Sequence, residues 1–387
     1  MENFIFCNPT KIIFGQGTDK NVGELIKPYA DKILFLYDIE AIKNNGAYER
    51  IIESLNSANI GYIELTGVKP NPRLKLVKEG IELCRKEKID FILAVGGGSV
   101  IDTAKAIGIG VDYDGDVWDY FMGKTKVTKT VPVGVILTIP ASGSESSATT
   151  VITNEEGLYK RDVVTGIILP KFAILNPELT YTLPVHQTAA GATDIISHVL
   201  ERYFTSVSNV DLTDRLCEAT IKTVIRNVYV AIAEPENYDG RAEIMWAGSI
   251  AHNDLLGTGR IADWATHSIG VEISAIYDIA HGETLSIIFP AWMKYVYKKY
   301  AERFAQYAVR VWNSEIYFNS IEKVALEGIK KTEDFFKSID MPVTLKEAGI
   351  SSERFDEMAS KATERGLIGN LVKLGKNDVL NILDLAK

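Results

Sequence analysis

The chain has 387 residues, of which 46% are hydrophobic and 24% are charged, so it can bury a large core and does not have the composition of a disordered protein. Its net charge is −9, and no stripe of Lys and Arg alternates with aromatic side chains, which speaks against nucleic acid or an anionic membrane surface as a partner. The sequence shows no signal peptide and no apolar run long enough for a membrane span, so a cytoplasmic protein that binds a small molecule is expected.

The N-terminal residues predict a β-hairpin at the edge of the fold. Two apolar runs, 4–6 and 11–14, flank Asn8 and Pro9, a turn-forming pair. Such an edge is suited to pairing across a dimer. The glycines at 15 and 17 lack the third glycine of the usual dinucleotide fingerprint, so they predict a plain turn.

The rest of the first half predicts a Rossmann-like α/β domain with a parallel sheet. Short runs rich in Ile, Val and Leu alternate with stretches of helical periodicity, which is typical of βαβ units. The clearest predicted strands are 33–37, 62–65, 91–95 and 133–138, and amphipathic crossover helices are predicted at 48–58 and 74–88.

Asp38 directly follows the first of these strands. A carboxylate at this place can accept hydrogen bonds from the ribose 2′-hydroxyl of a dinucleotide, and it repels a 2′-phosphate. The residue therefore favours NAD over NADP. It is equally compatible with a simple turn residue, and it precedes the glycine turn described next, contrary to the usual order.

The run 91–105 predicts a strand, a glycine turn and a helix. Glycines at such a turn let backbone amides approach a pyrophosphate, and the helix N-terminus supplies a favourable dipole. The cofactor-binding residues predicted here are Gly96, Gly97, Gly98, Ser99 and Asp102. The alternative carries equal weight: Ser99 and Asp102 have capping-box spacing, which also fits a well-capped helix without a ligand.

Thr138 and Ser142 complete the predicted cofactor set. They follow the strand 133–138 and offer hydroxyls and small residues where parallel sheets bind ligands. Taken alone, the run 138–145 fits any polar loop.

After Pro184 the pattern changes to long helices. These are predicted at 188–204, 211–230, 241–253 and 321–339. We therefore predict two domains, an α/β dinucleotide-binding domain at 1–183 and an all-α metal-binding domain at 184–387.

The first of these helices carries Asp194 and His198, four residues apart, so that a carboxylate and an imidazole share one helix face. Alone, such a pair is more often a surface ion pair than a metal site. The three cysteines are far apart and form no CxxC pair, so a metal would need other ligands.

His267 and His281 are the candidates for those further ligands. On one continuous helix, residues 14 apart would lie roughly 21 Å from each other, whereas ligands of one ion lie within about 4 Å. The chain must therefore break between them, and Tyr277 and Asp278 are the predicted place. Asp194, His198, His267 and His281 together suit Fe(II), with Zn(II) as the alternative. The competing interpretation is a core histidine and a helix cap.

Taken together, these runs resemble the iron-dependent (group III) alcohol dehydrogenase family, in particular its butanol dehydrogenase and aldehyde reductase branch. The matching segments, spread over essentially the whole chain, are 14–17, 69–72, 96–105, 191–201, 263–282 and 289–292. The resemblance implies a Rossmann-like domain, a helical domain, a cofactor cleft between them, the four metal ligands proposed above, and a homodimer built through the N-terminal hairpin.

Two departures from the family pattern stand out. Val271 occupies a position where family members often carry a histidine thought to help move the proton, so here that relay cannot be an imidazole. The run Asp38-Ile39-Glu40-Ala41 replaces a glycine-rich turn of NADP-using relatives, which again favours NAD.

The expected function is a metal-dependent alcohol dehydrogenase or aldehyde reductase that transfers hydride between NAD(H) and a small primary alcohol or aldehyde. A glycerol- or diol-type dehydrogenase and a dehydroquinate-synthase-like lyase are the alternatives within the superfamily. A metal hydrolase is disfavoured because H-E-x-x-H is absent, and a non-catalytic NAD-binding protein remains a further alternative. The exact substrate, the physiological direction and the metal loaded in the cell stay open at this stage.

Overall fold

The computed structural model describes residues 1–43 and 46–387, and the side chains of Glu40 and Ala41 lie outside its description. Contacts divide the chain into two compact units. The sheet unit contains residues 7–184 and 230–253, and the helical unit contains residues 1–6, 185–229 and 254–387. The predicted domain boundary between residues 183 and 184 stays a prediction. Residues 1–6 precede it but belong to the helical unit, and residues 230–253 follow it but belong to the sheet unit.

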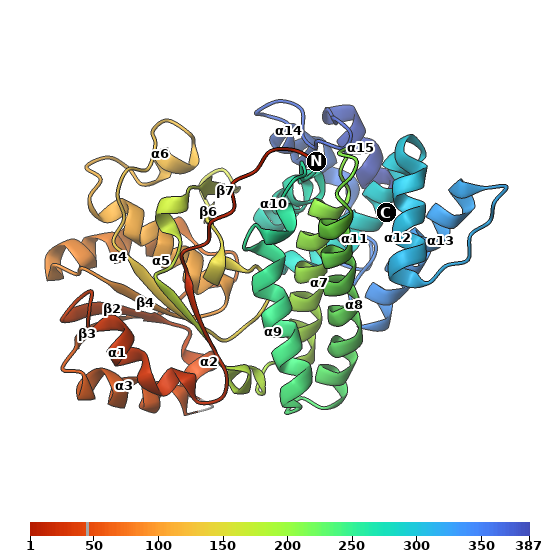
Figure 1. Ribbon diagram of the computed structural model, residues 1–387. Helices are drawn as coiled ribbons and strands as arrows, with labels where there is room; N and C mark the ends of the chain where they lie inside the picture. Colours follow the sequence, from red (N-terminus) through yellow and green to blue (C-terminus); the bar gives the residue numbers. More distant parts are fainter. Residues whose placement is uncertain (44–45) are drawn as a thin grey trace. The chain divides into compact units, whose positions relative to one another are not determined.

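The sheet unit is built on six parallel strands in the order β1-β8-β5-β4-β2-β3 (Figure 1). The strands are β1 (Lys11–Phe14), β2 (Lys32–Tyr37), β3 (Gly61–Leu65), β4 (Ile92–Gly96), β5 (Val133–Leu137) and β8 (Phe172–Leu175). The predicted parallel sheet is confirmed, and each of the four strands read from the sequence is present to within one residue at either end.

Helices cover both faces of this sheet (Figure 1). Side chains at alternating positions of the central strands, such as Phe35 and Leu93, pack with α1 (Val22–Ile26) and α3 (Ala47–Ser57). Their neighbours, such as Leu34 and Ala94, pack with α4 (Leu74–Glu87) and α5 (Gly98–Val111) on the other face. Because both faces are covered, the strands are continuously apolar, as buried parallel strands usually are.

The sheet unit contains further elements outside the six-stranded sheet. They are α2 (Ile39–Lys43), α6 (Trp118–Phe121), β6 (Thr149–Asn154), β7 (Tyr159–Val164), α9 (Tyr238–His252) and short 3-10 turns at Thr18–Asn21, Ser144–Ser146, Gly166–Ile168 and Pro177–Thr180. Strands β6 and β7 form an antiparallel pair that was not predicted from the sequence.

The predicted N-terminal hairpin is wrong. Residues 4–6 form no strand, and β1 instead pairs in parallel with β8 at the edge of the sheet. Asn8 explains the difference: its side-chain amide donates to the carbonyls of Ser146 and Asn253, at 2.7 and 3.3 Å, and its Oδ1 accepts from the backbone of Thr10 at 3.2 Å. The turn is therefore anchored to other segments and does not fold residues 4–6 back onto β1.

The helical unit contains three of the four predicted long helices, because the helix predicted at 241–253 is α9 and belongs to the sheet unit. Within the helical unit, α11 packs against both α7 and α10. Its elements are α7 (Val185–Tyr203), most of α8 (Asp211–Ala233), α10 (Ala265–Tyr277), α11 (His281–Val296), α12 (Ala301–Trp312), α13 (Ile321–Ser338), α14 (Phe355–Ala362), α15 (Lys376–Leu385) and 3-10 turns at Leu255–Gly257, Tyr297–Tyr300 and Ser352–Arg354. No helix within the described residues combines the length and apolar character needed to cross a membrane.

Candidate functional site

Three helices of the helical unit carry the predicted metal ligands. Asp194 and His198 lie on α7, His267 lies on the first turn of α10, and His281 is the first residue of α11. The predicted break between the last two is confirmed. Asp278 takes the left-handed conformation, with φ of 56°, directly after α10 ends at Tyr277, and such a residue stops a helix.

Asp194, His267 and His281 converge in the folded chain. One potential ligand atom from each of the three lies within 4.8 Å of the other two. His198 is adjacent to this group without belonging to it: its ring centroid is 4.7 Å from that of His267, and its Nδ1 is 3.4 Å from Oδ1 of Asp194. His198 therefore remains a predicted ligand, while the other three already share one locus.

The two ring nitrogens of His267 have different surroundings. Nδ1 lies 2.8 Å from a carboxylate oxygen of Glu201. Nε2 is buried and has no hydrogen-bond partner among the described residues. A buried nitrogen without a partner is costly, and one carboxylate with two imidazoles is a donor set that Fe(II) and Zn(II) accept. The residues present therefore fit a divalent transition-metal ion.

Two buried carboxylates lie beside this cluster. Glu201 is fully buried, and Asp263 is 1% exposed. Burial, together with the negative charge of Glu201, raises the pKa of Asp263 to about 6. Its carboxylate accepts hydrogen bonds from the backbone amides of Asn370, Leu371 and Ala265, at 2.7, 2.6 and 3.2 Å. The start of α10 is thus connected to a segment near the C-terminus.

In the sheet unit, the predicted cofactor residues follow three adjacent strands. The backbone amide of Asp38, after β2, donates to the carbonyl of Val95 in β4 at 3.2 Å, and that of Thr138, after β5, donates to Gly96 at 3.1 Å. The chain leaves β2 towards β3 but leaves β4 towards β5, on the opposite side. The carboxyl ends of β2 and β4 are therefore the topological switch point, where open α/β sheets bind ligands.

The same strand order explains why Asp38 precedes the glycine turn in sequence. β2 comes before β4 along the chain, but the two strands are neighbours in the sheet. Asp38 and the glycine turn thus follow neighbouring strands, whichever of the two comes first in the sequence. Beside them, Oγ1 of Thr138 is buried and has no hydrogen-bond partner within the part of the chain that the structure describes.

Close packing, and not an unusual backbone conformation, explains why this turn needs glycines. Gly97 is the N-cap of α5 and has a negative φ of −83°, so left-handed backbone is not the reason for a glycine there. A Cβ on Gly98 would lie 2.3 Å from Oγ of Ser142, and one on Gly96 would lie 2.4 Å from a methyl group of Val100. The glycines let the turn pack closely against its own helix and against the loop after β5.

The capping-box interpretation of this helix is wrong, because the N-cap is Gly97 and no side chain caps it. Asp102 is buried, and its carboxylate accepts hydrogen bonds from Oγ of Ser144 at 2.6 Å and from the amide of Val151 at 3.1 Å. Both oxygens of Asp102 thus contact the sheet unit itself. Ser99 and Ser142, in contrast, are partly exposed.

Lys105 was not singled out from the sequence, yet it is fully buried one turn after Asp102. Its ammonium group donates to the carbonyls of Ser144, Ser147 and Thr149, at 2.6, 2.9 and 2.9 Å. Burial lowers the pKa of Lys105 to about 8, although Asp102 and Glu145 act in the opposite direction. One cation thus fixes the loop that follows Ser142. The presence of a lysine in an otherwise strongly apolar helix could have indicated this buried residue from the sequence.

A second buried polar pair lies elsewhere in the sheet unit. Nζ of Lys160, on β7, donates to Oδ1 of Asn71 at 2.8 Å, and both side chains are buried. Asn71 has a positive φ of 53°. It belongs to the run 69–72 noted in the sequence, but the distance of 89 residues between the two partners gave no signal that they would meet.

Comparison with known proteins assigns this architecture to a family. The sequence profile described as iron-containing alcohol dehydrogenase matches residues 9–177, and the profile of the C-terminal part of the Fe-containing alcohol dehydrogenase family matches residues 188–386. The chain belongs to the iron-containing alcohol dehydrogenase family. The family resemblance read from the sequence is therefore confirmed.

Individual members of the family are similar over their whole length. A probable NADH-dependent butanol dehydrogenase of Bacillus subtilis is 43% identical, with 99% of each chain covered. An NADPH-dependent aldehyde reductase of Escherichia coli is 34% identical, over 97% of this chain and 96% of that protein. The crystal structure of an NADH-dependent butanol dehydrogenase of Thermotoga maritima has a TM-score of 0.96 and 41% identity, covering 100% of this chain and 99% of that one.

Proposed function

We propose that this member of the family is a metal-dependent, NAD(H)-linked alcohol dehydrogenase and aldehyde reductase that acts on small primary alcohols or aldehydes. The observation that carries the proposal is the convergence of Asp194, His267 and His281 at one locus, in a family named for iron and alcohol oxidation. The names of the butanol dehydrogenase and aldehyde reductase relatives support the substrate class.

Asp194, His198, His267 and His281 are the proposed metal ligands. When bound, Fe(II), or Zn(II) in its place, would supply Lewis-acid polarisation of the substrate oxygen. The residues of the chain set the conditions for this chemistry. Asp194 supplies a negative charge, and the buried Nε2 of His267 supplies a lone pair without competition from a protein donor among the described residues.

The proposed cofactor is NAD(H), bound by Asp38, Gly96, Gly97, Gly98, Ser99, Thr138 and Ser142. The adjacency of these residues at the switch point of the sheet supports this, as does the NADH dependence named for the 43% identical relative. Asp38 would accept the ribose hydroxyls and repel a 2′-phosphate, so NADP is the poorer cofactor. Asp102 is proposed to act indirectly, by holding Ser144 and β6 in place.

The proton released during alcohol oxidation must leave without an imidazole at position 271. Val271 lies on α10, one turn after His267, and its aliphatic side chain cannot carry a proton. We propose that water or a cofactor hydroxyl takes this part. A cytoplasmic location stays a prediction from the sequence.

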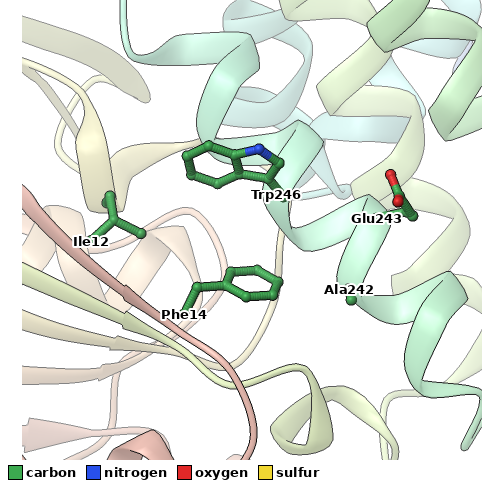
Figure 2. A pocket seen from close by; sticks show the side chains of 5 residues that line it. All are labelled: Ile12, Phe14, Ala242, Glu243 and Trp246. Atoms are coloured by element: carbon green, nitrogen blue, oxygen red, sulfur yellow. The ribbon is translucent and has the colours of Figure 1, made fainter.

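We also propose that the protein is a homodimer in which β1 is part of the interface. An apolar pocket of about 410 Å³ adjoins this edge strand and is lined by Ile12, Phe14, Ala242, Glu243 and Trp246 (Figure 2). The rings of Phe14 and Trp246 meet edge to face, and both are substantially exposed. The exposed side chains of Phe4, Ile5 and Phe6 of a second copy are suited to cover such a pocket. Sedimentation of Trp246→Lys should show a monomer; an unchanged dimer would contradict this interface.

One assay tests the catalytic proposal. Chelator-treated protein is incubated with NAD and butanol, or with NADH and butanal, and nicotinamide absorbance is followed before and after addition of Fe(II) or Zn(II). We expect turnover only after the metal is added, and much slower turnover with NADP. Full activity of the metal-free protein would refute the metal mechanism, and binding of NAD without turnover would indicate a non-catalytic protein.

A further inference from the structure

Glu201 is a buried carboxylate on the same stripe of α7 as the proposed ligands. Asp194, His198 and Glu201 follow one another at intervals of four and three residues, which places them along one face of a helix. Glu201 is fully buried. A buried carboxylate is tolerated only when donors surround it, so its surroundings indicate what it does.

The donors that surround Glu201 all come from the start of α10. Its two oxygens accept hydrogen bonds from the backbone amides of Trp264 and His267, at 2.6 and 3.1 Å, and from the hydroxyl of Thr266 at 2.5 Å. The N-cap of α10 is Trp264, whose backbone has a positive φ of 67° and whose side chain provides no cap. Glu201 therefore caps this helix from α7, where a negative charge is favourable.

The fourth donor is the imidazole of His267, whose Nδ1 lies 2.8 Å from Oε1 of Glu201. The oxygens of Glu201 already accept hydrogen bonds from two backbone amides and a hydroxyl, so a proton on Nδ1 is the arrangement that matches this site, and it leaves the lone pair on Nε2. This Nε2 is the buried nitrogen that lacks a partner among the described residues, and His267 belongs to the converging group. The same contact fixes both the tautomer and the orientation of the ring.

We propose that Glu201 is the positioning residue of the metal site: it fixes the backbone at the start of α10 and holds His267 in the tautomer that presents Nε2 to the ion. The inference rests on the proposed function, because it assumes that a metal binds at Asp194, His267 and His281. Glu201 is not a member of the converging group of Asp194, His267 and His281. It acts through His267, as carboxylates behind metal-binding histidines do.

The test compares Glu201→Gln with a matched variant, Glu218→Gln. Glu218 is a buried carboxylate of the same unit that contacts Tyr203 and Arg310 and none of the proposed ligands. Co(II) is titrated into chelator-treated full-length protein, and binding is followed by the visible absorption of the bound ion. Thermal unfolding of each metal-free variant is recorded to separate loss of fold from loss of affinity.

We expect Glu201→Gln to bind Co(II) about 10- to 100-fold more weakly than the wild type, and Glu218→Gln to bind it normally. Raising the Co(II) concentration should restore most of the turnover number of Glu201→Gln, because the ligands themselves are intact. Wild-type Co(II) affinity in Glu201→Gln would overturn the inference, as would an equal loss in Glu218→Gln. Failure of the wild type to bind Co(II) would instead refute the proposed function itself.

Discussion

The proposed metal site and the proposed cofactor site differ in the kind of chemical group that forms them. In the helical unit, three of the four proposed metal ligands, Asp194, His267 and His281, are side chains that reach one locus from α7, α10 and α11. In the sheet unit, the proposed cofactor residues follow adjacent parallel strands and contribute mainly backbone, glycines and small hydroxyl side chains. A single substitution of a metal ligand should therefore abolish metal binding, whereas a single substitution in the cofactor site should lower cofactor affinity only in part.

The largest expected effect comes from removing a metal ligand. His281→Ala should lose the metal and more than ~1,000-fold in kcat/KM, equivalent to about 4 kcal/mol of transition-state stabilisation, while NADH affinity changes little. Metal analysis, nicotinamide absorbance and NADH fluorescence titration measure the three quantities. His186→Ala is the matched control, because His186 is an exposed histidine on α7 that pairs with Glu283 outside the cluster. Normal metal content in His281→Ala would show that His281 is not required for metal binding and would contradict the proposed difference between the two sites.

The next effect concerns the framework of the sheet unit. Lys105→Met removes the donor to three backbone carbonyls and a buried cation that interacts with Asp102. Removing one partner of such a buried network costs about 3–5 kcal/mol, which corresponds to a fall in Tm of roughly 10 °C for a unit of this size. Calorimetry measures the shift. Lys27→Met, which breaks an exposed ion pair with Asp31, is the control and should leave Tm nearly unchanged. An equal effect of both variants would show that Lys105 is not a framework residue.

Asp263 gives the helical unit a distinctive dependence on pH. Its native pKa is about 6, above the ordinary value of 3.8, because of burial and the charge of Glu201. The native state therefore binds more protons than the unfolded state between these values, so the stability that Asp263 contributes is fully present below about pH 4 and is lost as the pH rises through about 6. The shift corresponds to at most roughly 3 kcal/mol.

Comparison of the wild type with Asp263→Asn isolates this contribution. We expect the Tm advantage of metal-free wild type over the variant to shrink between about pH 4 and pH 7, because the carboxamide of the variant does not titrate. Scanning calorimetry of both proteins in the same buffers measures it. A Tm difference that stays constant over this range would contradict the assigned direction of the pKa.

The smallest effect is expected for cofactor choice. Asp38→Gly would remove the charge-assisted hydrogen bonds proposed to the ribose, each contributing about 1.5–3 kcal/mol, and the proposed repulsion of a 2′-phosphate. We expect the preference for NADH over NADPH to fall by about 10- to 100-fold, measured as the ratio of kcat/KM values. Asp31→Gly, at an exposed carboxylate, should leave the ratio unchanged. An unaltered preference in Asp38→Gly would show that discrimination arises elsewhere.

The pattern of apolar residues determined much of the local structure without help from the fold. Strands such as β4 were predicted because a short, uninterrupted apolar run is typical of a strand buried on both faces. The end of α10 was predicted because Asp favours turns and the two histidines had to approach each other. The types of the candidate ligands followed from the absence of paired cysteines and the small number of histidines.

Other features were decided only by the tertiary structure. The parallel pairing of β1 with β8, the adjacency of β2 and β4 that brings Asp38 to the glycine turn, and the buried network of Lys105 all join residues far apart in sequence. Local periodicity reports which face of an element is buried but not which partner covers it. The same applies to Glu201, whose contact with His267 spans 66 residues. Sequence thus determined the elements and the chemistry of the ligands, while long-range packing decided which of them meet.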